Sequence, residues 1–153
     1  MITGIKYLSP TFDHSGYGEA SRNCIKALIG EGVPITLERQ AFEQTGPENY
    51  GEYGSKLASM LDKRIPYTHK IMHCTPEHYV KYVEKGIKHV GFIYWETSRV
   101  PDEWVTWFNK YVDAQIVCCD YTKDVLLECG INKPVFKLLP PFDMSDFDGV
   151  SPY

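Results

Sequence analysis

The sequence predicts an α/β domain built on one mostly parallel, six-stranded sheet with helices on both faces. Short apolar segments alternate along the chain with amphipathic helical segments, and this alternation is typical of parallel βαβ units. The segment KHVGFIYW (88–95) is almost continuously apolar, which is typical of a strand covered on both sides. Glycine and proline residues stand between the segments, where they end one element or begin the next.

The strands are predicted from short segments rich in β-branched and aromatic residues. Pro76 ends the third of them, because proline has no N–H to give to a sheet. The six predicted strands are GIKYLS (4–9), VPITLER (33–39), HKIMHCTP (69–76), KHVGFIYWET (88–97), AQIVCC (114–119) and KPVFKLLP (133–140).

The helices are predicted from apolar residues that recur with helical spacing. In the first helix Ala20, Cys24 and Leu28 share one face. We expect Asp120 to be the N-cap of the last helix and Gly130 to end it. The five predicted helices are GEASRNCIKALIGEG (18–32), SKLASMLDK (55–63), PEHYVKYVEKG (76–86), PDEWVTWFNKYV (101–112) and DYTKDVLLECG (120–130).

This order of elements predicts a Rossmann-like, three-layer α/β/α domain that spans residues 1–140, because crossovers between parallel strands are right-handed. Ligands of such domains gather at the carboxyl ends of the strands. We therefore expect the functional residues in four loops, 9–18, 40–54, 74–77 and 95–101.

The composition excludes some classes of protein and gives an expected location. A net charge of −4 without a basic patch argues against a nucleic-acid partner, and no segment is apolar for long enough to predict a membrane span. Five cysteines without disulfide spacing predict reduced thiols and a cytoplasmic protein. His73, Cys74 and His78 in HCTPEH are a conceivable metal-ligand set, but no second ligand pair at zinc-site spacing exists, so we predict no metal.

The segment HSGYGEASRN (14–23) has two glycines at the start of the first helix. Gly16 and Gly18 would let a phosphate approach the backbone N–H groups, which the helix N-terminus favours, and Arg22 would either add a charged contact or face solvent. The alternative is that the glycines only allow the loop to turn into the helix. The residues alone leave both interpretations open.

A dinucleotide-binding fingerprint is the less favoured interpretation of the same glycines. Ser21 stands where the third glycine of G-x-G-x-x-G is expected, although Glu38 lies at the distance where an acidic residue belongs. The segment PTFDHS (10–15) also separates the glycines from the first strand. An NAD-type oxidoreductase fragment therefore remains only an alternative.

The segment YWETSRVP (94–101) is the second concentration of polar residues. Glu96, Thr97 and Arg99 beside two aromatic rings could bind the hydroxyl groups of a sugar, with His73 on the neighbouring strand. The structural alternative is that Glu96 caps the following turn and pairs with Arg99.

Four motifs together resemble the N-terminal half of GT-B glycosyltransferases, in particular retaining enzymes like those of glycosyltransferase family 4. They are SGYGEASRN (15–23), HCTPEHY (73–79), GFIYWETSRVPDEW (91–104) and LLPPFD (138–143), and they cover essentially the whole chain in order. The resemblance implies an N-terminal domain that binds the acceptor of a sugar-transfer reaction. It also implies a C-terminal domain that holds the nucleotide-sugar donor, which would be a substrate and not a cofactor.

The resemblance implies roles for particular residues. Gly16, Tyr17 and Gly18 would approach the donor diphosphate, and Arg22 lies one helical turn beyond them. The implied acceptor-side residues are Asp13, His73, Glu96, Thr97 and Arg99. Neither a metal ion nor a protein nucleophile is implied, so no catalytic residue is assigned.

The resemblance also implies a missing half. Residues 141–153 look like the start of a linker, and the donor domain is absent, so we expect this chain to be inactive alone. Self-association through the surface that the other half would cover is expected as well. The main alternative is a standalone module that binds a carbohydrate or a nucleotide without catalysis.

Overall fold

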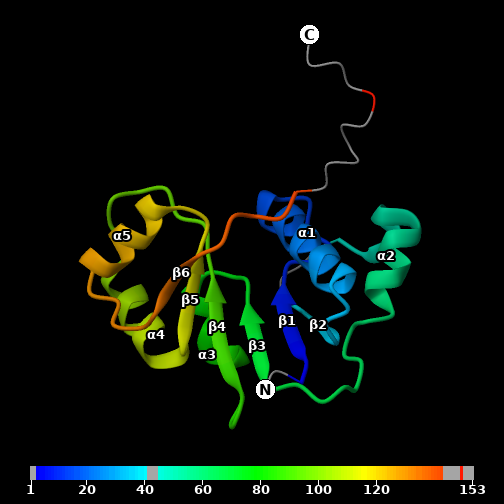
Figure 1. Ribbon diagram of the computed structural model, residues 1–153, viewed down its shortest axis with the longest axis horizontal. Coiled ribbons are helices and arrows are strands. Elements are labelled where there is room, and N and C mark those ends of the chain that lie inside the picture. Colours follow the sequence, from blue (N-terminus) through cyan, green and yellow to red (C-terminus); the bar gives the residue numbers. More distant parts are fainter. Residues whose placement is uncertain (1–2, 41–44, 143–148, 150–153) are drawn as a thin grey trace.

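The computed structural model describes residues 3–40, 45–142 and 149. Its centre is a six-stranded sheet in the order β2-β1-β3-β4-β5-β6, in which every neighbouring pair is parallel (Figure 1). The predicted α/β fold with a parallel sheet is confirmed. The strands are β1 (Ile5–Ser9), β2 (Ile35–Arg39), β3 (His69–Met72), β4 (Lys88–Phe92), β5 (Ala114–Val117) and β6 (Val135–Lys137).

In the part of the chain that the structure describes, five α-helices connect the strands, and two of them continue a short 3-10 helix. The 3-10 helices are η1 (Pro47–Tyr50), before α2, and η2 (Pro76–His78), before α3. The α-helices are α1 (Gly16–Gly30), α2 (Gly51–Ala58), α3 (Tyr79–Tyr82), α4 (Asp102–Tyr111) and α5 (Asp120–Glu128).

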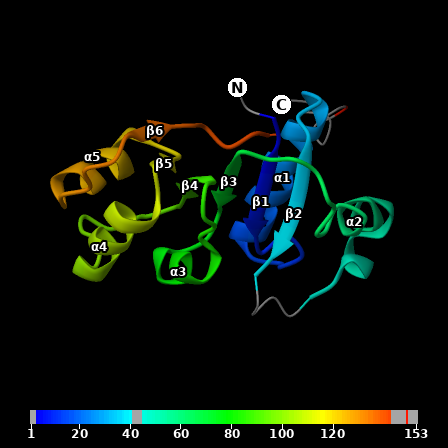
Figure 2. The same ribbon diagram turned by 90° about the horizontal axis from the view of Figure 1, so that it is seen from below.

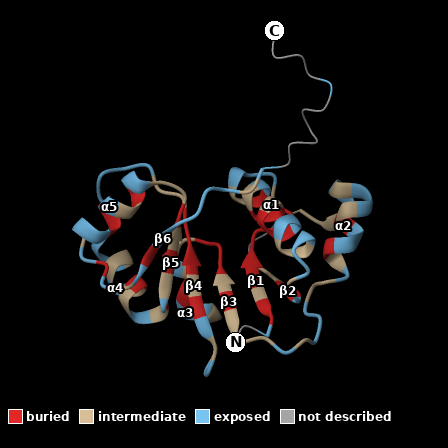
Figure 3. Cartoon of the chain, viewed as in Figure 1, coloured by how far each residue is buried: buried red, intermediate tan, exposed pale blue. Residues whose placement is uncertain are grey.

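The sheet separates two apolar clusters, because successive side chains of a strand point to opposite faces. Tyr7 of β1 belongs to the cluster beneath α1 and α2, and its neighbour Leu8 belongs to the cluster beneath α3, α4 and α5. α3 and α4 thus lie on one side of the sheet and α1 on the other, which gives the Rossmann-like three layers (Figure 2). Figure 3 shows the buried residues concentrated in the strands and on the inner sides of the helices.

The α1 side of the sheet is only partly covered. Ile71 and Ile116 are half-buried there and line an apolar pocket of about 280 Å³ beside α1. Phe136 of β6 is exposed, and the chain after β6, which crosses in front of the sheet toward α1 (Figure 1), exposes Leu139 and Phe142. Self-association through this surface stays a prediction.

Four strands, β3 to β6, are shorter than predicted at their carboxyl ends, and the difference is largest in β3 and β4. β3 ends at Met72 instead of residue 76, and β4 ends at Phe92 instead of residue 97. The next residues still bond to the neighbouring strands, since the His73 amide donates to Leu8 O (2.9 Å) and the Ile93 amide to Ile116 O (3.2 Å). Beyond them the chain leaves the sheet and forms its rim.

The helix predicted over residues 76–86 contains only η2 and the single turn of α3. The chain leaves the helix at Val83, and Glu84 turns toward the sheet. There the Glu84 carboxylate accepts a hydrogen bond from the buried Lys70 ammonium (2.7 Å), and the Glu84 amide donates to His89 Nε2 (2.9 Å). This ionic contact replaces the continuation of the helix.

Lys70 is the centre of a buried ionic cluster on the α3 side of β1, β2 and β3. Its ammonium lies 2.6 Å from the Glu38 carboxylate and 2.7 Å from that of Glu84, and only 1% of its side chain is exposed. Lys6 pairs with the same two carboxylates at 3.4 and 3.1 Å. Two cations therefore face two anions, and the cluster carries no net charge.

Smaller corrections concern helix ends. Cys119 stands at the N-cap position of α5, whereas the predicted cap, Asp120, is the first helical residue and pairs with Lys137. Gly130 follows α5 with a φ of 97°, a conformation that favours glycine, so its predicted role at the helix end is confirmed.

Two further statements apply only to the described part of the chain. None of its helices has the length and apolar character needed to cross a membrane. Most of the predicted linker over 141–153, and residues 41–44 of the predicted loop 40–54, lie outside the described residues.

Candidate functional site

The candidate site lies at the carboxyl ends of the strands, where the order of the strands reverses. The chain passes from β1 outward to β2 and then returns past β1 to β3, so β1 and β3 flank the switch point. Open α/β sheets bind ligands in the crevice at this point. The loops that meet here are 10–15 after β1, residue 40 after β2 and residues 73–78 after β3.

Arg22 holds the loop between β1 and α1 in place. Its guanidinium donates hydrogen bonds to the carbonyl oxygens of Thr11 (2.9 Å) and Asp13 (2.8 Å), to the Tyr50 hydroxyl (3.1 Å) and to the Glu19 carboxylate (2.7 Å). The Arg22 side chain is 8% exposed. The Arg22 side chain could reach a phosphate only by giving up these bonds. Its structural role is to hold the loop, and its predicted role at the donor stays a prediction.

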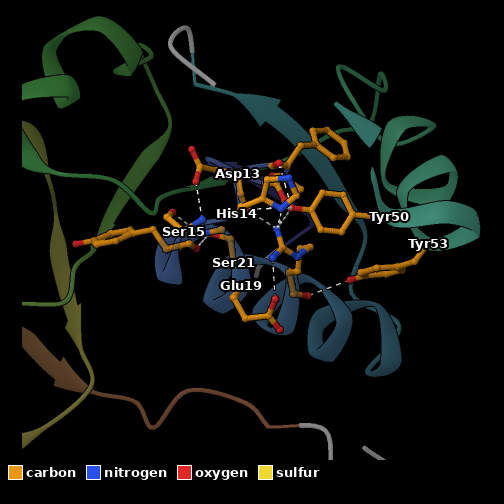
Figure 4. Close-up of polar contacts among 12 residues, drawn as sticks. Asp13, His14, Ser15, Glu19, Ser21, Tyr50 and Tyr53 are labelled. Carbon is orange, nitrogen blue, oxygen red and sulfur yellow. Dashed lines mark hydrogen bonds and ion pairs between the residues drawn. The ribbon is translucent and has the colours of Figure 1, made fainter. Parts of the chain in front are cut away.

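The start of α1 is capped by residues of the same loop (Figure 4). Ser15 is the N-cap, and its Oγ accepts a hydrogen bond from the Gly18 amide (3.3 Å). Asp13 Oδ1 accepts from the Ser15 amide (2.6 Å), and this bond holds the pKa of the Asp13 carboxyl below its usual value. The carboxylate therefore lies where the helix dipole favours a negative charge.

The two glycines of the loop have different surroundings. A Cβ on Gly18 would lie 2.1 Å from Asp13 O and 3.0 Å from Pro10 O, whereas a Cβ on Gly16 would meet nothing within 4 Å. Glycine at position 18 is thus required for the close approach of the loop to the helix. This supports the structural interpretation for Gly18, and it leaves the exposed Gly16 and the half-buried Tyr17 as the start of the helix.

Tyr17 joins the start of α1 to the end of β4. Its hydroxyl donates to the carbonyl oxygen of Tyr94 (3.2 Å) and accepts from the amide of the same residue (3.1 Å). The two rings pack edge to face with their centroids 5.4 Å apart. The loop after β4 is fixed a second time by Thr122 Oγ1, which donates to Trp95 O (2.9 Å).

His73 is enclosed beneath Tyr17 and is completely buried. Its ring stacks on Phe92 at a centroid distance of 4.3 Å, and Nδ1 lies 2.8 Å from the Tyr7 hydroxyl and 3.2 Å from Ser21 Oγ. Burial lowers the pKa of this imidazole to about 3. A ligand in the crevice does not reach this side chain unless Tyr17 moves.

The predicted residues in the loop after β4 are exposed at the carboxyl end of the sheet, and none of them shares a pocket with Asp13 or Tyr17. Glu96 is exposed and has no bonding partner among the described residues, while the Thr97 hydroxyl donates to Arg99 O (2.9 Å). Arg99 pairs with Asp102 (2.9 Å) and not with Glu96, so the structural alternative for Glu96 is wrong. Arg99 lines a separate polar pocket that includes Asp102 and Glu128.

One small pocket brings together residues from all three strand ends. Its volume is about 200 Å³, and it is lined by Pro10, Asp13, Ser15, Tyr17, Gln40, Cys74 and Thr75. Of the predicted residues it contains Asp13 and Tyr17. Hereafter it is called the rim pocket.

Gln40 is the residue of the rim pocket that sequence analysis missed. It follows the last residue of β2, it is only 3% exposed, and its amide nitrogen Nε2 has no hydrogen-bond partner in the described structure. It lies beside the Cys74 thiol, and sulfur is a weak acceptor. The signal in the sequence was a polar residue directly after a predicted strand.

The site holds no evident metal centre. No group of three or more histidine, cysteine, aspartate or glutamate side chains in the described ranges is placed to bind a metal ion. All five cysteines, which belong to these ranges, are free thiols.

No family model, curated protein or solved structure matches this chain. Its function is therefore inferred from the fold, the rim pocket and the sequence motifs.

Proposed function

We propose that this chain is the acceptor-side domain of a retaining glycosyltransferase, which transfers a sugar from a nucleotide sugar to a glycan, lipid or protein acceptor. The observation that carries the proposal is the rim pocket, where Asp13 and Gln40 converge beside the start of α1 at the switch point of the sheet. This is the edge at which the motifs SGYGEASRN and HCTPEHY meet.

In this proposal the domain supplies one wall of a cleft, and a second Rossmann-like domain holds the donor. The rim pocket orients the acceptor. The first amides of α1, at Gly16 and Tyr17, have no acceptor within the helix. They would stabilise the negative charge that grows on the leaving diphosphate. Half of such a cleft supplies only part of the positioning on which the rate depends, so the isolated chain is inactive.

The proposal extends to where the protein works and to what it needs. Five free thiols suit a reducing cytoplasm. The nucleotide sugar is a substrate, and neither a metal ion nor a cofactor takes part. No side chain is assigned as a nucleophile.

The test compares two polypeptides. We would express the product of the complete coding sequence and measure UDP or GDP release from nucleotide sugars, with and without saccharide acceptors, beside the 153-residue chain. The proposal is supported if the longer product releases more nucleotide when an acceptor is present and the 153-residue chain releases none. A coding sequence that stops at Tyr153, or a longer product that never releases nucleotide, contradicts it.

Glu96→Gln tests the acceptor side of the proposal in the longer product. The variant should slow acceptor-dependent transfer more than hydrolysis of the donor, because Glu96 lies at the rim with its carboxylate exposed. Equal effects on both rates would remove Glu96 from the acceptor site.

A second candidate is a carbohydrate-binding module without catalysis. It is favoured by the hydrogen bonds that Arg22 donates to the carbonyl oxygens of Thr11 and Asp13. Because Arg22 is engaged in this way, no cationic side chain of the described residues lines the rim pocket, where a nucleotide phosphate would need one. This candidate would be supported if the protein bound sugar saturably and its complete product never turned over a nucleotide sugar.

A further inference from the structure

The rim pocket contains an unsatisfied buried donor. Buried polar groups in native structures nearly always have a hydrogen-bond partner, because a group left without one loses its hydration without compensation. Gln40 Nε2 is buried without a partner, and Gln40 lines the rim pocket. A ligand with an acceptor oxygen would supply the missing partner.

The charges around the rim pocket select a neutral ligand. The ionised Asp13 carboxylate already lies at the start of α1, 2.6 Å from the Ser15 amide. It would repel an anionic group placed beside it inside the rim pocket, whereas the Gly16 amide, which is proposed to face the donor diphosphate, does not line this pocket. Among the described residues, neither lysine nor arginine lines the rim pocket.

The other polar groups of the rim pocket include both hydrogen-bond donors and acceptors. Ser15 Oγ accepts from the Gly18 amide and keeps its own proton for donation, while Thr75 Oγ1 donates to Glu77 Oε1 (2.7 Å) and can accept. Hydroxyl groups both donate and accept, so a polyol matches this mixed set better than a phosphate does. Pro10 and Tyr17 add apolar surface for the C–H face of a ring.

The size of the rim pocket limits the ligand to one ring. Its volume of about 200 Å³ is smaller than the ~300–1,000 Å³ of pockets that enclose drug-sized ligands. A nucleotide would not fit in it.

We propose that the rim pocket binds one uncharged pyranose unit, with Gln40 Nε2 donating to one ring hydroxyl and the Asp13 carboxylate accepting from another. The inference rests on the proposed function in that it names the chemical class of the acceptor, a saccharide. It also assigns to Gln40 a role in specificity.

The experiment is an NMR titration of the 15N-labelled 153-residue chain with glucose, mannose and galactose, and separately with inorganic phosphate and UDP. We expect at least one sugar to shift the Gln40 side-chain amide signals saturably, together with the backbone amides of Ser15 and Thr75. Gln40→Leu should abolish this binding, and Asp13→Asn should weaken it by about tenfold, as the loss of a hydrogen bond to a charged group does.

Two further variants separate loss of binding from loss of folding. Gln40→Glu keeps the shape of the side chain but replaces its donor by an acceptor, so it should also abolish binding while the spectrum stays native. Thr106→Ala changes an exposed hydroxyl on α4, outside the rim pocket, and should bind sugar as the parent chain does.

Two outcomes would overturn the inference. In the first, phosphate or UDP shifts the amides of Gly16 and Tyr17 while no sugar moves the Gln40 signals, which would make this an anion site. In the second, no probe moves them at ~0.1 M, far above the millimolar range of weak specific binding. A third result separates the two proposals. If this chain binds sugar but the longer product transfers none, the proposed function is refuted and the sugar site is not.

Discussion

The hydroxyl of Tyr17 makes two hydrogen bonds to one residue, Tyr94, whose carbonyl oxygen accepts at 3.2 Å and whose amide donates at 3.1 Å. Tyr94 lies beyond the end of β4, and the Tyr17 hydroxyl makes the two backbone hydrogen bonds that a neighbouring strand would otherwise make to it. The start of α1 and the loop after β4 are joined by this pair, although 77 positions separate them in the sequence. The spacing between these two segments is therefore fixed.

Tyr17→Phe should destabilise the chain by about 1–3 kcal/mol, because it leaves the amide and carbonyl of Tyr94 without their partner. Urea denaturation measures the free energy of unfolding. The control is Tyr121→Phe, which removes the hydroxyl of an exposed tyrosine and should change stability little. Equal effects in the two variants would show that the double hydrogen bond contributes nothing.

Alanine at the two glycines should have opposite effects. Gly18→Ala places a Cβ 2.1 Å from Asp13 O, so the loop or the helix must shift and the chain should lose stability. Gly16→Ala meets open space in the first turn of α1 and should be neutral or stabilise the chain by up to ~1 kcal/mol. Thermal unfolding of the pair measures this difference. An unaltered melting temperature for Gly18→Ala would contradict the structure of the loop.

The buried imidazole of His73 should make stability fall in acid. The pKa of His73 is lowered to about 3 in the folded chain, and an unfolded histidine titrates near ~6.5. Between these values the unfolded state binds more protons. The stabilisation is fully present above pH ~6.5 and is lost at up to ~1.4 kcal/mol per pH unit as the pH falls toward ~3.

His73→Phe keeps an aromatic ring against Phe92 and removes the titrating group. Its free energy of unfolding, measured from pH 7 to pH 4, should fall less steeply than that of the parent chain. The difference in slope should be up to ~1.4 kcal/mol per pH unit. Acidic groups titrate in both proteins, so they cancel in the comparison. Parallel pH profiles would show that His73 is not held neutral.

The buried ionic cluster should be sensitive to the loss of one charge. Lys70→Met removes the most buried charge of the cluster and leaves two partly exposed carboxylates facing only Lys6, so it should cost about 1.5–3 kcal/mol. The matched control is Lys88→Met in the exposed pair with Asp113, where a loss below ~1 kcal/mol is expected. Denaturation of both variants tests this contrast, and similar losses would refute it.

Glu84 adds a pH dependence to the same cluster. Burial alone would raise its pKa, but hydrogen bonds from Lys70, Tyr67 and Lys6 lower it to about 2. The stabilisation is therefore present above the unfolded pKa near ~4.3 and is lost as the pH falls toward ~2. Glu84→Gln should flatten this part of the stability profile, and an unchanged profile would argue against the ionic contact.

Sequence analysis predicted the six strands of the described residues in their succession along the chain, because apolar alternation and turn residues are local signals. It failed where a distant contact decides the conformation. The helix over 76–86 stops at Tyr82 because Glu84 pairs with Lys70, and no local pattern indicates that pair.

The candidate site could be predicted only in part, for the same reason. Asp13 and Tyr17 were named from the loop before α1 and do line the rim pocket. His73 was predicted to lie within the third strand, which ends one residue before it, and its burial depends on Tyr17 and Phe92. Gln40 begins a loop in which functional residues were expected, but no motif singles it out, and the parallel alignment of β1, β2 and β3 brings it beside the other two strand ends.

The partly covered side of the sheet should be visible in calorimetry. The heat capacity change of unfolding grows with the apolar area that unfolding newly exposes, and it averages ~12–15 cal/mol/K per residue in globular proteins. In this chain Phe136, Leu139 and Phe142 are 58%, 71% and 62% exposed before any unfolding. Their area adds little to the change, so the stability curve of this chain should be flatter with temperature than its length implies.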